Sequence, residues 1–147
     1  MNGYLLDTNV VSAFAPARRP PSTEVRDWLE EHSDRLFLSV ISIVEIEAGV
    51  RKIRRAGQRR RADDLAAWLN DIVENYGDRV LPFDLAGSRL AGMITDRVRA
   101  KGQNPGFSDI AIAATAVQRD LLLLTANVRH FGPTGVNHVN PFEMLPD

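Results

Sequence analysis

Short apolar runs alternate along this chain with longer segments in which apolar residues recur at a helical period, and this alternation constrains the fold most. The runs occupy residues 4–6, 36–38, 80–81, 121–124 and 136–139, and their lengths favour β-strands. Between them, apolar side chains return every three or four residues within 25–32, 65–76 and 90–98, which predicts amphipathic helices. Strands separated by helices favour an α/β fold, with a mainly parallel sheet of about five strands covered on both faces.

Length and composition predict one soluble globular domain spanning residues 1–147. A chain of 147 residues is long enough to bury a core of its own. A content of 44% hydrophobic and 25% charged residues is ordinary for a globular protein. The chain starts without a basic leader, and no apolar run approaches the ~20 residues of a membrane span. We therefore expect a cytoplasmic protein with no membrane partner.

Charge and cysteine content exclude several kinds of site. The net charge is −1, so any affinity for phosphate groups must come from local patches rather than from the overall field. The chain has no cysteine, which excludes disulfides, zinc–thiolate sites and thiol nucleophiles. It also has no Gly-x-x-x-x-Gly-Lys run, which excludes a P-loop kinase.

Polar side chains stand where the predicted strands end. Asp7 directly follows the first strand, and Asn127 comes just after the fourth. Glu45 lies one to two turns into the helix after the second strand, and Asp109 begins the helix before the fourth. Ligands of open parallel sheets gather outside the carboxyl ends of the strands. We therefore expect these four side chains to converge, although they are far apart in sequence.

Each of these positions also has a plain structural explanation as part of a helix cap. Asp7 is a good cap for the helix that follows it, Ser42 and Glu45 fit a capping box, and Ser108 with Asp109 fits an N-cap followed by an acidic first turn. An apolar segment follows Asp109, however. A carboxylate at the mouth of a buried helix is costly unless it is paired, hydrogen-bonded or bound to a metal.

Convergence of the three carboxylates would itself favour a metal ion. At separations of about 4 Å and an effective dielectric constant near 20, each like-charged pair costs about 4 kcal/mol. A divalent cation removes this repulsion; otherwise one carboxyl group must stay protonated. Ligands that are all oxygen, without cysteine or paired histidines, favour Mg²⁺ or Mn²⁺ over zinc.

Four segments in this order resemble the motifs of the PIN-domain nucleases, and most closely those of the VapC-type toxins of bacterial toxin–antitoxin pairs. They are Leu5-Leu6-Asp7-Thr8-Asn9, residues 42–49 with Glu45, residues 107–113 with Asp109, and residues 123–127 with Asn127, followed by His130-Phe131. Each segment alone is a weak motif, but four in register are specific. The resemblance extends from residue 4 to about residue 142.

The resemblance implies a PIN-like three-layer α/β/α fold and a metal-dependent ribonuclease. Asp7, Glu45 and Asp109 would hold Mg²⁺ or Mn²⁺, and Asn127 would be a fourth catalytic position. The resemblance also implies an RNA substrate, a homodimer and a cognate antitoxin protein that blocks the site. The fourth position is often Asp in this family, whereas Asn127 brings no negative charge, which puts a tightly held second metal ion in doubt.

Residues next to these motifs have more specific predicted roles. Glu47 is the obvious rival of Glu45, but two positions along a helix point about 200° apart, and the family spacing selects Glu45. Asn9 and Thr125 are predicted to orient the carboxylates through hydrogen bonds.

Seven of the eighteen basic residues are concentrated in eleven positions that follow the Glu45 motif. They are Arg51, Lys52, Arg54, Arg55, Arg59, Arg60 and Arg61. This segment predicts contact with an RNA backbone or with an acidic antitoxin segment, and a solvated connection between helices explains it equally simply. His130, three residues after Asn127, is a further candidate for contact with RNA or antitoxin, although a surface histidine is the simpler interpretation.

Two other functions compete with the nuclease. A phosphatase with an aspartyl nucleophile after the first strand would need a second Asp two residues later, where this chain has Asn9. The stronger alternative is a catalytically silent PIN-fold module that binds RNA or protein. Retention of three carboxylates argues against such a module, and Asn127 argues mildly for it.

Overall fold

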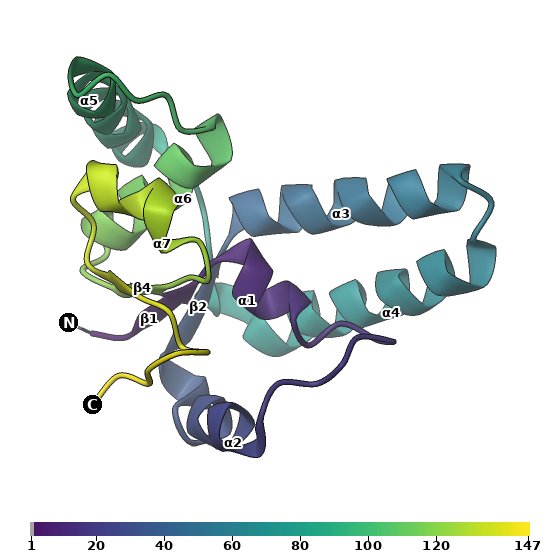
Figure 1. Ribbon diagram of the computed structural model, residues 1–147. Helices are drawn as coiled ribbons and strands as arrows, with labels where there is room; N and C mark the ends of the chain where they lie inside the picture. Colours follow the sequence, from purple (N-terminus) through teal and green to yellow (C-terminus); the bar gives the residue numbers. More distant parts are fainter. Residues whose placement is uncertain (1) are drawn as a thin grey trace.

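All neighbouring strands of the central sheet run parallel, as expected from strands that are connected by helices. The computed structural model describes residues 2–147 (Figure 1). Its strands are β1 (Tyr4–Leu6), β2 (Leu36–Ser39), β3 (Val80–Leu81), β4 (Leu122–Leu124) and β5 (His138–Val139), in the spatial order β3-β2-β1-β4-β5. The predicted five-stranded parallel sheet is confirmed. The fourth strand begins one residue later than predicted, and the fifth is two residues shorter.

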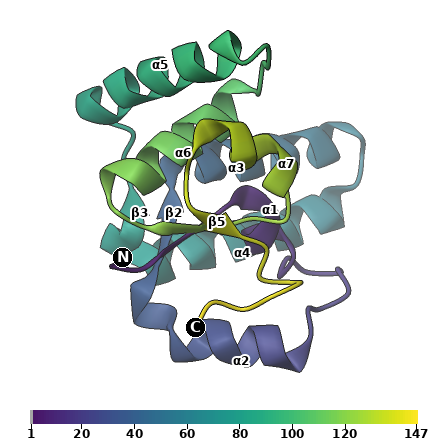
Figure 2. The same cartoon turned by 60° about the vertical axis from the view of Figure 1, so that its left-hand side comes forward.

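Helices connect these strands and cover both faces of the sheet. They are α1 (Thr8–Ser12), α2 (Thr23–Glu31), α3 (Val40–Arg55), α4 (Arg59–Tyr76), α5 (Leu85–Ala100), α6 (Phe107–Gln118) and α7 (Val128–Phe131), with short 3₁₀ turns at Ser33–Arg35, Gly77–Arg79 and Gly132–Thr134. Figure 2 shows α2 below the sheet and α6 above it, with α5 outside α6. Among residues 2–147, no helix combines the length and the apolar character needed to cross a membrane.

The two-residue period of the strands decides which side chains enter which layer. Tyr4 and Leu6 pack against Trp28 and Leu29 of α2 and Leu69 of α4 in one buried cluster. The side chain between them, Leu5, belongs to a second buried cluster, which includes Ile112 of α6 and Phe131 of α7. The sheet is therefore buried on both faces, and the predicted three-layer α/β/α fold is confirmed.

Helix α6 is buried around most of its circumference because it lies between the sheet and α5. Its residues 110–116 are all buried, as expected for a helix without a polar face. Ala91, Ile94 and Val98 of α5 form a third cluster with its outer side. Asp109, in the first turn of α6, is thus carried at the mouth of a closely packed helix.

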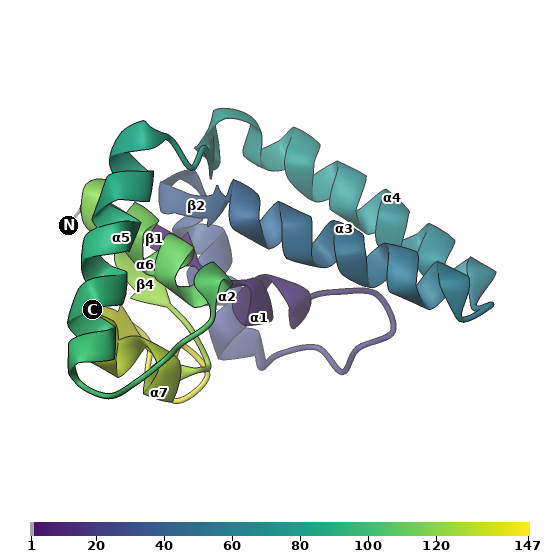
Figure 3. The ribbon, with the colours of Figure 1, turned by 90° about the horizontal axis from the view of Figure 1, so that it is seen from above.

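Helices α3 and α4 form a hairpin that extends beyond the sheet. Figures 1 and 3 show the two helices side by side, with their connection at the end farthest from the strands. Gly57 in this connection has a φ of +87°, a conformation that favours glycine. Gly77 and Gly102 also follow the ends of helices and have a positive φ.

Two helix starts differ from the caps expected from the sequence, and Asp84 supplies a further cap. Asp84 caps α5, since its Oδ1 accepts a hydrogen bond from the Gly87 amide at 2.8 Å. The capping box of Ser42 and Glu45 is wrong, because Ser39 caps α3 and strand β2 passes into that helix without a loop. The N-cap of α6 is Gly106 rather than Ser108.

The order in which strands are added to the sheet changes sides at β1. The chain builds outward from β1 through β2 to β3 and then returns to place β4 on the other side of β1. Ligands of open parallel sheets bind at such a switch point, outside the carboxyl ends of the strands. Asp7 follows β1 here and Thr125 follows β4, and both side chains are buried.

Gly3, which precedes β1, is predicted to tolerate no side chain. An added Cβ would lie 2.6 Å from the backbone oxygen of Arg35 and 3.0 Å from the Phe37 ring. Because a backbone atom cannot swing aside, we expect Gly3→Ala to lower the free energy of unfolding by about 1–3 kcal/mol. Gly92→Ala on α5 meets open space and should raise it by about 0.5–1 kcal/mol. Thermal denaturation followed by circular dichroism measures both; equal melting temperatures would contradict the prediction.

Candidate active site

Asp7 is the buried anchor of the candidate site. It is the N-cap of α1, and its Oδ1 accepts a hydrogen bond from the Thr8 amide at 2.8 Å. Its Oδ2 accepts one from the Thr125 hydroxyl at 2.8 Å and one from the side-chain amide of Asn9 at 3.1 Å. Both carboxylate oxygens are therefore held by donors from the ends of β1 and β4.

The pKa of Asp7 is raised by its burial and by the charges near it. Burial raises this pKa above its usual range, and the hydrogen bonds from Thr125 and Thr8 partly offset the effect. The negative charges of Asp109 and Glu45 raise it further. The structure thus brings the three predicted carboxylates close enough to interact electrostatically.

Glu45 reaches the site from the second turn of α3 through a pair of hydroxyl groups. Its Oε1 accepts a hydrogen bond from Thr8 Oγ1 at 2.6 Å, and Thr8 Oγ1 lies 2.8 Å from the buried Ser42 Oγ. An ionised carboxylate only accepts, so Thr8 donates to Glu45 and Ser42 donates to Thr8. Sequence analysis missed both hydroxyl residues, although Thr8 stands in the Asp-Thr-Asn segment next to Asp7.

Glu47 lies outside the candidate site, as the helical geometry predicts. It is exposed on α3 and forms an ion pair with Arg51 one turn later, with 3.5 Å between Arg51 Nε and the Glu47 carboxylate. This contact orients the Glu47 side chain along the outer surface of the hairpin.

Asp109 enters the site from the first turn of α6 and touches α7. Its side chain is partly buried, and its Oδ2 lies 3.0 Å from Nδ1 of His130. The imidazole of His130 is 57% exposed, so this residue forms part of the rim of the site. The structure thus places His130, named from the sequence only as a possible contact for RNA or antitoxin, against a predicted metal ligand.

Thr125 and Asn9 connect the carboxyl ends of β1 and β4. Besides donating to Asp7, the Thr125 hydroxyl accepts a hydrogen bond from the Asn127 amide at 2.9 Å. Asn9 Oδ1 accepts one from the Ala126 amide at 3.1 Å. Both residues thus have the contacts that their predicted role in orienting Asp7 requires, and the role itself stays a prediction.

Asn127 is placed less definitely than the carboxylates. It is the N-cap residue of α7, its side chain is exposed, and it makes no side-chain capping hydrogen bond. Only its backbone amide joins the Thr125 hydroxyl. The structure therefore gives Asn127 a position beside the site, while its predicted catalytic role stays a prediction.

The donor set fits Mg²⁺ or Mn²⁺. Three carboxylates supply only oxygen ligands, the type that these ions prefer. Within residues 2–147, no three acidic or histidine side chains are already spaced to ligate one ion directly. Mg²⁺ usually keeps several of its waters, and contacts through water span longer distances than direct ligation. Burial raises the pKa of Asp7, and the nearby charges of Asp109 and Glu45 add to this effect; a divalent cation would relieve the repulsion among the three.

Two cavities flank the carboxylates. One, of about 260 Å³, lies on the Glu45 side. Apolar side chains of α3 and α4, including Ile46, Leu65 and Trp68, line part of it, and residues of α1 and of segment 15–18 line the rest. The other, of about 390 Å³, lies on the Asp109 side and is bordered by His130 and the 103–106 loop.

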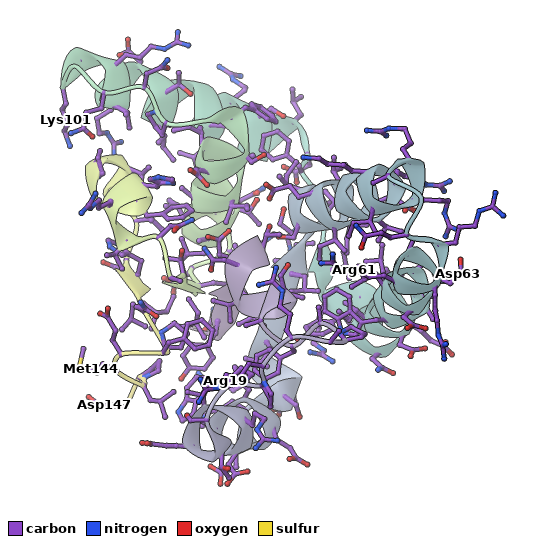
Figure 4. All side chains as sticks on the ribbon, turned by 45° about the vertical axis from the view of Figure 1, so that its right-hand side comes forward. Arg19, Arg61, Asp63, Lys101, Met144 and Asp147 are labelled. Atoms are coloured by element: carbon purple, nitrogen blue, oxygen red, sulfur yellow. The ribbon has the colours of Figure 1, made fainter. Side chains whose placement is uncertain are left out.

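The seven basic residues predicted to contact RNA or antitoxin are exposed on the α3–α4 hairpin. Figure 4 shows Arg61 there together with Asp63. Arg54 forms an ion pair with Asp63 at 2.8 Å, and Arg51 is paired with Glu47. Arg61 borders the cavity on the Glu45 side. Internal ion pairs therefore explain part of this basic segment, and its binding role stays a prediction.

Comparisons with known proteins agree with this geometry. The PIN domain family matches residues 4–132. The chain is 33% identical over 141 residues to a plasmid stability protein of Pseudomonas syringae, covering 95% of this chain and 98% of that protein. It is 31% identical over 140 residues to a VapC ribonuclease of Sinorhizobium fredii, covering 95% and 97%.

A solved structure gives the same result for the fold. The crystal structure of FitAcB from Neisseria gonorrhoeae superposes with a TM-score of 0.82 and 29% sequence identity, covering 96% of this chain and 99% of that chain. The family match covers far more than half of the chain, and relatives above 30% identity span nearly all of it. This chain therefore belongs to the PIN domain family, among its VapC-type members.

Proposed function

We propose that this protein is a metal-dependent ribonuclease that hydrolyses RNA phosphodiester bonds and acts as the toxin of a toxin–antitoxin pair. The observation that carries the proposal is the meeting of Asp7, Glu45 and Asp109 at the switch point of the sheet, where burial raises the pKa of Asp7 and the charges of Asp109 and Glu45 raise it further. A relative named VapC ribonuclease and one named toxin FitB support the activity and the role.

Asp7, Glu45 and Asp109 would hold Mg²⁺ or Mn²⁺. When bound, the ion lowers the pKa of an attacking water, polarises a phosphodiester oxygen and offsets developing charge. Thr125, Asn9 and Thr8 keep the carboxylates oriented through their hydrogen bonds. One of the carboxylates accepts the proton of the attacking water. By the family resemblance, the products carry 5′-phosphate and 3′-hydroxyl ends.

The same proposal places the protein in the cytoplasm and includes two protein partners, an antitoxin and a second copy of this chain. A cognate antitoxin would block the carboxylates, and the cavity on the Glu45 side suits it because apolar residues of α3 and α4 line the wall while Arg18 and Arg61 lie at its border. The exposed apolar side chains Leu85, Met93 and Phe107, on α5 and at the start of α6, supply a surface for the proposed homodimer.

Cleavage of RNA by purified protein free of antitoxin tests the nuclease. We expect Mg²⁺ or Mn²⁺ to support cleavage and EDTA to abolish it. Asp7→Asn should lower the rate by about a hundredfold or more, because loss of a metal ligand removes several kcal/mol of transition-state stabilisation. Glu47→Gln is the matched control and should cleave like the wild type.

Cleavage by Asp7→Asn at the wild-type rate would show that the site is wrongly assigned. A folded protein that binds RNA but cleaves it with neither metal ion would instead favour the catalytically silent module. The exposed, uncharged Asn127 is the feature of the chain that agrees with that alternative.

Asp7 gives the metal-free protein a specific pH dependence. Because the folded pKa is raised, the contribution of this carboxyl group to stability is fully present below its unfolded pKa and is lost as pH rises through the folded pKa. In EDTA, the melting temperature of the wild type relative to Asp7→Asn should therefore increase as pH falls from about 7 to about 4. Saturating Mg²⁺ should reverse this trend, since a bound cation lowers the pKa. Parallel pH profiles of the two proteins in EDTA would refute the assignment.

Thr125 is predicted to act by positioning Asp7. Thr125→Val removes a hydrogen bond that lowers the pKa of Asp7, so the acidic limb of the pH–rate profile should move to higher pH. The rate should fall about 10–100-fold, as is typical when a partner of a metal ligand is lost. Thr125→Ser keeps the hydroxyl and should restore both properties; a purely structural role would lower activity without moving the acidic limb.

A further inference from the structure

The cavity on the Asp109 side of the carboxylates has no role in the reaction as proposed so far. It has a volume of about 390 Å³, and its polar lining includes Gln103 and Asn104 of the α5–α6 loop, Asp109 of α6, and Arg129 and His130 of α7. We call this cavity, with these five residues, the Arg129 pocket.

We propose that the Arg129 pocket binds the nucleotide next to the scissile phosphate of a single-stranded RNA. Arg129 contacts a backbone phosphate of that nucleotide, and the amides of Gln103 and Asn104 contact its base. This inference rests on the proposed ribonuclease function and names the part of the protein that binds the substrate beside the carboxylates.

The Arg129 pocket adjoins the carboxylate cluster. Asp109 belongs both to the carboxylate cluster and to the wall of the pocket, and the contact of its Oδ2 with His130 Nδ1 at 3.0 Å joins the two. A strand whose phosphodiester lies at the carboxylates therefore passes directly into this pocket on the Asp109 side.

Arg129 places a positive charge beside the carboxylates. A phosphate approaching three carboxylates is repelled, and a cation next to them reduces that repulsion in addition to a bound Mg²⁺ or Mn²⁺. Arg129 is exposed, forms no ion pair within residues 2–147 and lines the same cavity as Asp109.

Other cations lie along the same edge. Lys101, labelled at the end of α5 in Figure 4, donates a hydrogen bond to the Pro133 carbonyl at 3.2 Å, and Arg97 donates one to the Thr134 carbonyl at 3.4 Å. Both carbonyls belong to the turn that follows α7. The positive charge at this edge is therefore held beside the pocket.

The Arg129 pocket also carries side chains that can contact a base. An amide side chain both donates and accepts hydrogen bonds, which suits the edge of an unpaired base in single-stranded RNA. Two such amides, those of Gln103 and Asn104, line this pocket, whereas the described residues that line the cavity on the Glu45 side include neither asparagine nor glutamine.

The salt dependence of RNA binding tests the role of Arg129. Binding of a short fluorescent single-stranded RNA is measured in EDTA, where metal-dependent cleavage stops, over a range of salt concentrations. Each phosphate contact contributes about 0.7 to the slope of log affinity against log salt. Arg129→Gln should reduce that slope by about 0.7 and weaken binding about fivefold at about 0.1 M salt. Arg129→Lys should keep the slope, and Arg89→Gln, a charge-matched change on the exposed side of α5, should alter neither property.

The proposed contact between Asn104 and the base is tested with a separate variant. Asn104→Ala should leave the salt slope unchanged, because it removes no charge, and should change the relative affinities for RNAs that differ at a single base. A uniform loss of affinity for every RNA would contradict a base contact at this residue.

Three results would overturn the role of Arg129. The first is an unchanged slope for Arg129→Gln with a reduced slope for Arg60→Gln, which would place the RNA on the α3–α4 hairpin. The second is an Arg129→Gln variant that binds an acidic peptide more weakly than the wild type but binds RNA equally well, which would identify a protein contact. The third is absence of RNA binding by the wild type. Cleavage by the wild type in Mg²⁺ is measured separately. A reduced salt slope for Arg129→Gln without cleavage by the wild type supports RNA binding in the pocket and rejects the nuclease. Cleavage by the wild type with an unchanged slope for Arg129→Gln supports the nuclease and rejects RNA binding in the pocket.

Discussion

The hydrogen bond from the Thr125 hydroxyl to the Asp7 carboxylate joins residues separated by 118 positions in the chain, and the geometry of the site depends on it. It forms only because β1 and β4 pair in parallel, with Leu6 beside Leu124, and the Asp7 amide extends that pairing by donating to the Leu124 carbonyl at 2.9 Å. The same hydroxyl accepts from the Asn127 amide and so fixes the start of α7. Strand register, the orientation of Asp7 and the position of His130 beside Asp109 are therefore linked.

A buried carboxylate near two others opposes folding, and the surrounding structure compensates for it. Backbone and hydroxyl donors hold Asp7, and the closely packed α6 carries Asp109 on a rigid element. Glu45 is exposed and is positioned by the Thr8 and Ser42 hydroxyls rather than by burial. Stability lost at a functional site is a common feature of proteins whose activity needs charges in close proximity. The apolar clusters on both faces of the sheet supply the compensating free energy, since burial of apolar surface is the dominant favourable contribution to folding.

The sequence predicts the parallel sheet well because strands buried on both faces are continuous apolar runs, whereas most of the helices between them keep a polar face. It also indicates Asp7 and Asp109, since Asp7 directly follows the first apolar run and Asp109 directly precedes the apolar segment of α6. It does not reveal the Thr8–Ser42–Glu45 chain of hydroxyl contacts, because the start of α3 depends on how β2 ends: Ser39 takes the cap and leaves Ser42 to face α1. The contact between His130 and Asp109 is equally hidden, because it requires α7 to fold back against α6, and no local pattern encodes that tertiary arrangement.

Local density of positive charge does not by itself identify a surface that binds nucleic acid, because clustered cations can have other partners. The seven clustered cations draw attention in the sequence, yet two of them form ion pairs within the hairpin. Lys52, Arg54 and Arg55 lie in the last turn of α3, where a positive charge stabilises the helix by interacting with its dipole. Arg129 likewise lies in the last turn of its helix, the short α7, but it also borders the cavity that contains Asp109. Coulomb energy falls with distance and is screened within about 10 Å at moderate salt. The cations that border the carboxylates, Arg129 on the Asp109 side and Arg61 on the Glu45 side, therefore act on a bound phosphate more strongly than those farther along the hairpin.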